Sequence, residues 1–180
     1  MQPNKLILST ALTLSCFLPF AQADDWYAET FVAGIYVDGE DYVVGPDENS
    51  LSSVGLRGGY KLSKNFSLEV EAQTGLDGDT NYSLGLGEIN LDASYGLFGT
   101  YSAPVSDKLS LHGRVGVVRN EYLIESNLGG SKVTTSDSFA FGVGTTFDLT
   151  DTLYLRGDLT QFNSYSADSS SLSVGAGFRF

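Results

Sequence analysis

The sequence predicts an all-β protein, an eight-stranded antiparallel up-and-down barrel. Apolar residues recur at every second position in eight segments, the spacing of strands with two different faces. No segment keeps a helical period, and 21 glycines, 10 tyrosines and 11 phenylalanines suit strands that crowd and turn. The segments are joined alternately by short turns and long polar loops, as in a meander of antiparallel strands.

The first 23 residues are expected to be a signal peptide that is cleaved after Ala23. Lys5 precedes an apolar run at residues 6–20, and the small residues Ala21 and Ala23 follow it. This order is typical of a secretory signal peptide, and the run is short for the ~20 residues of a membrane-spanning helix. The expected domains are therefore a signal peptide at 1–23 and a barrel at 24–180. Cys16 would leave with the signal peptide.

Four segments in the first half of the mature chain alternate in this way. Residues 26–37 (WYAETFVAGIYV) alternate least regularly, and the sequence leaves open whether Glu29 or Phe31 faces the lumen. Residues 54–62 (VGLRGGYKL) and 66–72 (FSLEVEA) place bulky apolar residues in one register and glycine, serine or charge in the other. Residues 89–101 (INLDASYGLFGTY) repeat the split, with Phe98 as an exception.

Four further segments complete the predicted barrel. They are residues 109–117 (LSLHGRVGV), 139–149 (FAFGVGTTFDL), 153–160 (LYLRGDLT) and 172–180 (LSVGAGFRF). Short turns are expected at 63–65, 103–107 and 150–151, and longer polar loops at 38–52, 74–88, 119–136 and 163–170. Short turns on one rim and long loops on the other describe an up-and-down barrel.

Alternation alone does not say which face is in contact with water. A soluble barrel turns its apolar face inward and binds a small apolar ligand there, whereas a transmembrane barrel turns that face to lipid. The polar register here holds mainly glycine, serine, threonine and a few charges, which favours a narrow interior. Aromatic residues lie near strand ends, where an interfacial girdle is expected: Tyr60, Phe66, Tyr101, Phe147, Phe178 and Phe180. The sequence favours the transmembrane barrel, with an exported soluble barrel as the alternative.

The last strand carries a resemblance to a known family. Its apolar residues occupy every second position up to Phe180, and with "GRVGV" and "SFAFGVGTTFD" upstream it resembles the Gram-negative outer-membrane barrels. The similarity is to the small eight-stranded barrels of the outer membrane protein X and Ail type, and to the membrane domain of outer membrane protein A. It implies a location in the outer membrane, among lipid and lipopolysaccharide.

The same resemblance implies partners. In that family the last strand is the signal recognised by the barrel-assembly machinery, so Phe178 and Phe180 are expected to serve as the assembly signal. Phe180 is also expected to close the barrel against the first strand. Contact of the acidic loops with a host or surface partner, in adhesion or envelope protection, rests on the resemblance alone.

Eight charged residues in the polar register predict a bonded network inside the barrel. They are Arg57, Arg114, Arg156 and Arg179, with Glu69, Glu71, Asp92 and Asp158. A buried charge without a partner costs several kcal/mol, so equal numbers of the two signs suit a closed interior. At matching parity Arg57 should face Glu69 or Glu71. We expect a plugged lumen, because eight strands leave little room, with a small ion channel as the alternative.

Other function classes find little support. The net charge of −12, or −13 once Lys5 is removed, disfavours nucleic-acid binding. His112 lies two residues from Ser110 in the polar register, but the sequence identifies no acid to orient it, so no catalytic residue is predicted. The Gly-x-Gly stretches at 142–144 and 175–177 do not precede helices and predict no phosphate loop. No cofactor or metal motif is found, and the acidic loops match no EF-hand.

Overall fold

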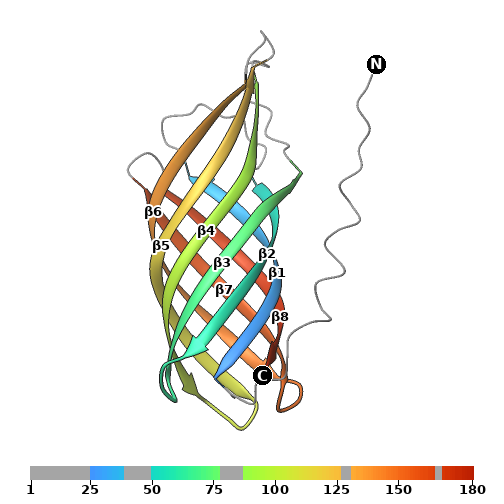
Figure 1. Cartoon of the computed structure of the whole chain (residues 1–180), viewed down its shortest axis with the longest axis vertical. Coiled ribbons are helices and arrows are strands. Elements are labelled where there is room, and N and C mark those ends of the chain that lie inside the picture. Colours follow the sequence, from blue (N-terminus) through green and yellow to red (C-terminus); the bar gives the residue numbers. More distant parts are fainter. Residues whose placement is uncertain (1–24, 39–49, 78–86, 127–130, 165–167) are drawn as a thin grey trace.

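The computed structural model describes residues 25–38, 50–77, 87–126, 131–164 and 168–180 as eight strands and their connections. The strands are β1 (Trp26–Asp38), β2 (Ser50–Lys61), β3 (Phe66–Asp77), β4 (Gly87–Pro104), β5 (Leu109–Ser126), β6 (Ser131–Asp148), β7 (Leu153–Ser164) and β8 (Asp168–Arg179). Each strand pairs with its neighbours in chain order, and β8 pairs with β1, so the sheet is a closed barrel (Figure 1). The predicted eight-stranded antiparallel barrel is confirmed. In the described part of the chain, no helix is long and apolar enough to cross a membrane.

The end of the chain closes the barrel against its beginning. Phe180 N donates to Trp26 O at 3.0 Å, and Trp26 N donates to Phe180 O at 3.3 Å. The strands continue antiparallel from Tyr27 opposite Arg179 to Asp38 opposite Asp168. Phe180 therefore supplies the last pair of the β1–β8 seam, as predicted.

The three short turns share one local arrangement of hydrogen bonds. In each, a backbone N–H at the end of one strand donates to the carbonyl that begins the next, as from Leu62 to Phe66 at 2.8 Å. The hydroxyls of Ser63, Ser106 and Thr150 each accept a hydrogen bond from the backbone N–H three residues later. A hydroxyl that bonds its own turn stabilises a tight connection. The five-residue pattern occurs at 62–66, 105–109 and 149–153.

Strands β4, β5 and β6 are longer than the others and rise beyond them (Figure 1). Each has 18 residues, against 12 or 13 in the other five strands. The predicted loop at 119–136 is wrong, because pairing of β5 with β6 continues from Val118 opposite Ser138 to Glu125 opposite Ser131. The polarity of this segment predicts a loop, but its β-branched and aromatic residues, such as Tyr122, Val133 and Thr134, favour a strand.

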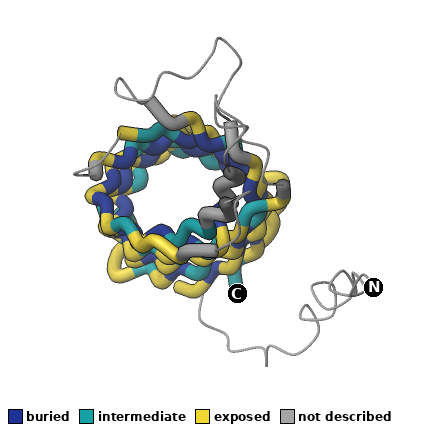
Figure 2. The backbone as a smooth tube through the Cα atoms, turned by 90° about the horizontal axis from the view of Figure 1, so that it is seen from above, coloured by how far each residue is buried: buried dark blue, intermediate teal, exposed yellow. Residues whose placement is uncertain are grey.

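The two faces of the barrel have opposite chemistry, with buried positions facing the lumen and exposed ones facing outward (Figure 2). Large apolar side chains are exposed on the outward face, for example Leu155 at 43% and Val174 at 58%. Arg57 and Arg156, at 2% and 5%, are buried. The alternative of an exported soluble barrel with an apolar core is therefore wrong, because the apolar face points outward.

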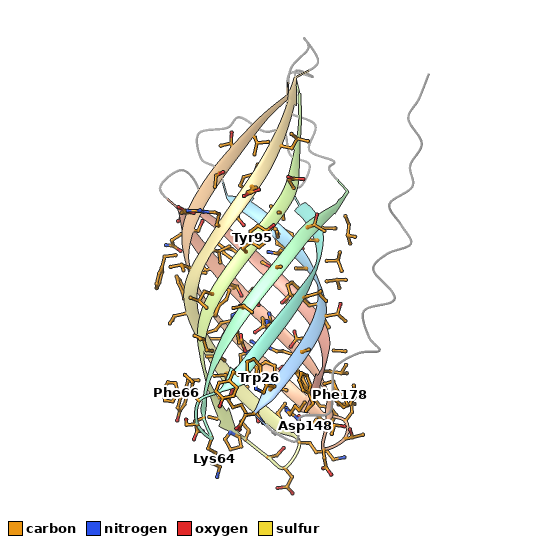
Figure 3. All side chains as sticks on the ribbon, in the orientation of Figure 1. Trp26, Lys64, Phe66, Tyr95, Asp148 and Phe178 are labelled. Atoms are coloured by element: carbon orange, nitrogen blue, oxygen red, sulfur yellow. The ribbon has the colours of Figure 1, made fainter. Side chains whose placement is uncertain are left out.

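Aromatic side chains gather on the outside near the rim with the short turns. Trp26 packs against Tyr60 with ring centroids 4.8 Å apart, and Phe66 against Tyr101 at 4.9 Å. Figure 3 shows Trp26, Phe66 and Phe178 at this end and Tyr95 nearer the other. Aromatic rings favour the boundary between lipid and water, so this belt marks one membrane interface.

A β-bulge in β4 reverses the alternation near the rim with the long loops. The pairing with β5 shifts register between Leu91 and Ala93. Leu91 is buried at 5% exposure and packs with Ile35, whereas Asp92 is exposed. An extra residue in one strand moves the following side chains to the opposite face. The prediction that Asp92 faces the lumen is therefore wrong, because simple alternation does not reveal a bulge.

Candidate functional site

A cluster of charged side chains occupies the part of the lumen nearer the short turns. We call it the lumen charge cluster, and its members come from five strands: Glu29 of β1, Arg57 of β2, Glu69 and Glu71 of β3, His112 and Arg114 of β5, and Arg156 and Asp158 of β7. Their side chains are at most 4% exposed, except for 12% at Glu71. Period-two alternation brings them together, because each lies on the inward face of its strand.

Arg57 of β2 bonds to its two neighbouring strands, β1 and β3, and to the more distant β7. It lies directly opposite Glu29 in β1 and Glu71 in β3, and its guanidinium hydrogen-bonds to both carboxylates. Its Nη1 also donates to Asp158 Oδ2 at 3.1 Å. The predicted pairing of Arg57 with β3 is realised through Glu71, while Glu69 Oε2 is 3.9 Å away.

Arg156 spans the lumen from β7 to β3, which lie on opposite sides of the eight-stranded ring. Its Nη1 donates to Glu69 Oε1 at 2.7 Å, and its Nε donates to Asp158 Oδ2 at 3.0 Å. Glu69 Oε1 also accepts a 2.6 Å hydrogen bond from the hydroxyl of Tyr27. One guanidinium therefore joins two buried carboxylates across the interior.

His112 and Arg114 bring β5 into the cluster. His112 Nε2 lies 2.6 Å from Asp158 Oδ1, so Asp158 is the acid partner that the sequence could not identify. Arg114 Nη2 donates to Glu71 Oε1 at 2.6 Å. The Arg114 guanidinium also lies over the Phe98 ring, 3.6 Å from its centroid, a cation–π contact.

Gly144 makes room for the contact between His112 and Asp158. It lies opposite both residues in the sheet. A Cβ at this position would come within 2.8 Å of Asp158 Oδ1 and would also meet His112 Nε2. The Gly-x-Gly stretch at 142–144 therefore serves close packing inside the lumen.

Two tyrosines close the cluster toward the turn rim. Tyr154 donates to Glu29 Oε2 at 3.3 Å, and its ring lies 6.4 Å from that of Tyr27. Arg179 stacks on Tyr154 at 4.5 Å and pairs with Asp148 at 2.8 Å. The side chains of this pair are 23% and 31% exposed, so Arg179 belongs to the rim. Arg179 keeps the predicted inward register, but it pairs with Asp148 and not with the charges of the lumen charge cluster, so that part of the predicted network is wrong.

The structure changes the predicted balance of charges. Asp92 and Arg179 are outside the cluster and Glu29 is inside it, so three arginines face four carboxylates. The open choice between Glu29 and Phe31 has a simple answer: they are two residues apart, face the same way, and are each 4% exposed. The sequence gives no clear signal for the side that Glu29 faces, because bulky apolar residues occur in both registers of this strand.

The cluster offers bonding between strands but no recognisable reactive centre. In the described part of the chain, no serine or threonine hydroxyl hydrogen-bonds to His112, whose contact is with a carboxylate. No group of three or more His, Cys, Asp or Glu side chains among the described residues could hold a metal ion. What the arrangement provides is a set of charge-assisted bonds that tie opposite walls together.

The family model for the outer membrane protein β-barrel domain matches residues 7–180. The chain belongs to this family. It is therefore a protein of the outer membrane, and its exposed apolar face lies toward lipid. No protein with a curated description matches the chain.

Solved structures show the same fold at low sequence identity. Ail of Yersinia pestis is 18% identical, with a TM-score of 0.64 over 88% of this chain and 100% of Ail. Neisserial surface protein A is 14% identical, with a TM-score of 0.65 over 86% and 97% of the two chains. The N-terminal barrel of Pseudomonas aeruginosa OprF is 14% identical, with a TM-score of 0.62 over 86% and 97%. One Ail structure is a complex with the heparin analogue sucrose octasulfate.

Proposed function

We propose that this protein is a structural, non-conducting barrel of the outer membrane and not an enzyme, with its lumen plugged by the lumen charge cluster. The observation that carries the proposal is the pair of bonds across the interior. Arg156 of β7 reaches Glu69 of β3 at 2.7 Å, and Arg57 of β2 reaches Asp158 of β7 at 3.1 Å. Side chains that bond across a ring of eight strands occupy the path that ions would need.

Contacts above and below the cluster support a closed lumen. Tyr27 and Tyr154 lie on its turn side and bond to Glu69 and Glu29. Farther toward the loop rim are two apolar clusters, one of Phe98, Val118, Ala140 and Phe162, and the other of Ile35, Leu91 and Tyr122. An ion would have to pass both apolar and bonded layers. A small ion channel, the second candidate, requires these layers to open.

Conductance in planar lipid bilayers tests the plug. The wild-type barrel is expected to show no steps of porin size. Arg114→Ala removes a guanidinium between Glu71 and Phe98 and should increase ion leak, whereas its outward neighbour in Val115→Ala should not. Porin-sized steps in the wild-type protein would contradict the proposal.

We also propose that the rim with the long loops contributes to adhesion or envelope protection. Residues 38–52, 74–92, 119–137 and 163–168 hold 13 acidic and 2 basic residues, a net charge of 2 − 13 = −11. Like charges repel, so this rim disfavours a polyanion of the kind bound by Ail and favours a neutral or cationic partner. Parts of these segments lie outside the described residues.

Loop deletion tests that role. Removal of residues 39–49 or 78–86, scored by adhesion of whole cells and by survival in serum, should lower one of the two. Each variant must still reach the outer membrane in wild-type amounts. If both deletions leave adhesion and survival unchanged, the role is architectural only.

We further propose that residues 1–23 are cleaved as a signal peptide, which leaves the barrel domain at 24–180, and that Phe178 and Phe180 serve as the assembly signal. Phe178 is 45% exposed on the outer face, and the rings of Phe178 and Phe180 stack with centroids 6.3 Å apart. Both rings are therefore presented together at the seam.

The mass of the mature protein tests the cleavage, since a mass that includes residues 1–23 would contradict it. Phe180→Ala should reduce the amount in the outer membrane, whereas Phe66→Ala in the same belt should have less effect.

A further inference from the structure

Each of the three short turns begins with an exposed apolar side chain. Leu62, Val105 and Leu149 stand at the first position of the five-residue pattern and are 65%, 58% and 43% exposed. The hydroxyl residue of the pattern follows, then two polar residues, and the fifth residue is again apolar. Tight turns in contact with water are built mainly from glycine, proline and small polar residues. An apolar side chain at the same place in all three turns therefore needs a physical account.

These side chains continue the surface that faces lipid. Leu62 lies two residues after Tyr60, and Leu149 lies two residues after Phe147, both exposed aromatic residues of the outward face. Because side chains alternate along a strand, positions two apart point to the same side of the sheet. Val105 continues the outward register of β4 in the same way. The apolar outer face therefore runs past the aromatic belt and onto the turns.

The first residues of the turns lie within the depth of a lipid headgroup layer. Two residues of a strand rise about 7 Å, and a tilt of about 40° leaves about 5 Å of this rise along the membrane normal. A bilayer of about 40–45 Å has a hydrocarbon core of about 30 Å, so each headgroup layer is about 5–7 Å thick. Since the aromatic belt marks the membrane interface, Leu62 and Leu149 fall inside this layer. Figure 3 shows Lys64, at the tip of the first turn, farther out along the barrel axis than Phe66 and Trp26.

The backbone of the turns suits a layer that holds little water. In the turn at 62–66, the N–H groups of the first, second, fourth and fifth residues donate to the carbonyl of Phe66 or to the hydroxyl of Ser63, at 2.8–3.4 Å. The same four positions donate in the same way in the other two turns. Backbone groups that leave water must be bonded within the protein. The hydroxyl residue of each turn therefore lowers the cost of placing that turn in the membrane interface.

The positions of the turns around the ring favour lipid over a protein partner. The turns join β2 to β3, β4 to β5 and β6 to β7, so they alternate with the other connections around the closed barrel. A protein that docks on one side of the barrel would not contact all three, whereas a lipid leaflet surrounds the barrel. The polar residues at the turn tips, such as Lys64, can reach past the apolar part to headgroups and water. The three turns therefore fit one continuous partner that encloses the rim.

We propose that the three short turns are inserted into the lipid headgroup layer, where Leu62, Val105 and Leu149 anchor this rim of the barrel. The partner is the surrounding leaflet, through its glycerol and headgroup region. The hydroxyl residue bonds the backbone of each turn, the apolar residues contact lipid, and the polar tip meets the headgroups. This anchoring does not depend on whether the barrel conducts ions, nor on the partners of the long loops.

Spin labels on single cysteines test the insertion in vesicles of phosphatidylcholine. The full chain with Cys16→Ser has no cysteine, so a nitroxide can be attached at Leu62→Cys, Val105→Cys or Leu149→Cys alone. The collisions of each label with oxygen, which concentrates in lipid, and with a water-soluble nickel chelate report its surroundings. All three labels should favour oxygen over the nickel chelate.

Two reference positions calibrate this measurement. Val143→Cys, on the outward face of β6 with Val143 63% exposed, gives the collision rates of a label in contact with lipid. Lys64→Cys gives the rates at a turn tip, where the nickel chelate should collide more often than at the three anchor positions. Labels at the anchor positions that meet the nickel chelate as often as the label at the tip would overturn the proposal, and the apolar residues would then be open to a protein partner.

Unfolding in urea from the same vesicles provides a second, independent measurement. Leu62→Asn and Leu149→Asn should each lower the equilibrium constant for folding roughly three- to tenfold, as expected when about half of a leucine side chain loses its contact with lipid. Leu62→Met keeps the apolar surface and should retain wild-type stability. The matched control is Lys64→Asn in the same turn, which exchanges one polar side chain for another and should cause no loss. If Leu62→Asn and Leu149→Asn are as stable as Lys64→Asn, the anchoring by lipid is contradicted.

Discussion

Two arginine–aspartate pairs of the barrel have similar geometry in opposite surroundings. In the lumen, Arg156 donates to Asp158 from Nε at 3.0 Å and from Nη2 at 3.1 Å. On the outer face of the extension formed by β4, β5 and β6, Arg119 donates to Asp137 from Nε at 2.7 Å and from Nη2 at 3.0 Å. The side chains of the first pair are 4% and 1% exposed, and those of the second 59% and 67%.

The difference between the pairs lies in what happens when one partner is lost. In the lumen, a carboxylate without its arginine is left without water, and the cost of its desolvation is uncompensated. On the outer face, water and salt replace the missing partner, and exposed pairs contribute little to stability. Hydrogen-bond geometry alone therefore does not reveal which pair holds the barrel together.

The largest expected effect is that of Arg156→Ala. It leaves Glu69 and Asp158 short of a buried cation, so the free energy of unfolding should fall by about 3–5 kcal/mol. Urea titration can follow this through the single tryptophan, Trp26, which lies at the β1–β8 seam. Leu155→Ala, the outward neighbour, is the control for a nearby truncation. Equal losses of unfolding free energy in the two variants would mean that the bonds of Arg156 in the lumen stabilise the barrel no more than an outward apolar side chain does.

A smaller loss is expected from Gly144→Ala. The added Cβ meets the backbone oxygen of Gly157 as well as His112 Nε2 and Asp158 Oδ1, and overpacking of this kind costs about 1–3 kcal/mol. Gly99→Ala is the control, because a Cβ at Gly99 meets nothing within 4 Å. Denaturation midpoints that agree for the two variants would show that the sheet and the lumen charge cluster around Gly144 accommodate a Cβ without loss of stability.

The coupling between Arg156 and Glu69 can be isolated by a double-mutant cycle. With Arg156→Met, Glu69→Gln and the double variant, we expect an interaction free energy of about 0.5–3 kcal/mol, as for residues in one network. The double variant should be more stable than the sum of the single losses predicts, because it leaves neither charge alone. Strict additivity would show that the two residues act independently across the lumen.

The smallest effect is expected at the exposed pair. Arg119→Ala should leave the urea midpoint unchanged within error, because water takes over the contacts of Asp137. Raising the salt concentration should likewise leave the difference between Arg119→Ala and wild type near zero. A loss as large as that of Arg156→Ala would remove the distinction between the two regions.

Much of the fold could be predicted because the strands repeat at a period of two. The orientation of Arg57, Arg114, Arg156, Glu69, Glu71 and Asp158 followed from this period, and the turn positions followed from breaks in it. Two residues of the predicted network were misplaced for local reasons. Asp92 is the extra residue of the bulge between Leu91 and Ala93, and Arg179 lies at the rim with the short turns, where it pairs with Asp148.

The rest of the site depends on contacts between strands that are distant in sequence. Glu29 lies in the least regular strand, and its partner Arg57 is known only once β1 and β2 are in register. The acid next to His112 comes from β7, 46 residues away. No local pattern carries that information, because the closing of the ring decides which inward residues meet.

Alternation is a local property of each strand, so the sequence alone was enough to predict an eight-stranded barrel with apolar residues outside and charged residues inside. The identity of the charges that meet, the ratio of three arginines to four carboxylates, and the extension of β4, β5 and β6 beyond the other strands became known only from the folded barrel. Two residues on opposite walls meet only if the register of every intervening strand pair, including its bulges, brings them to the same height in the lumen.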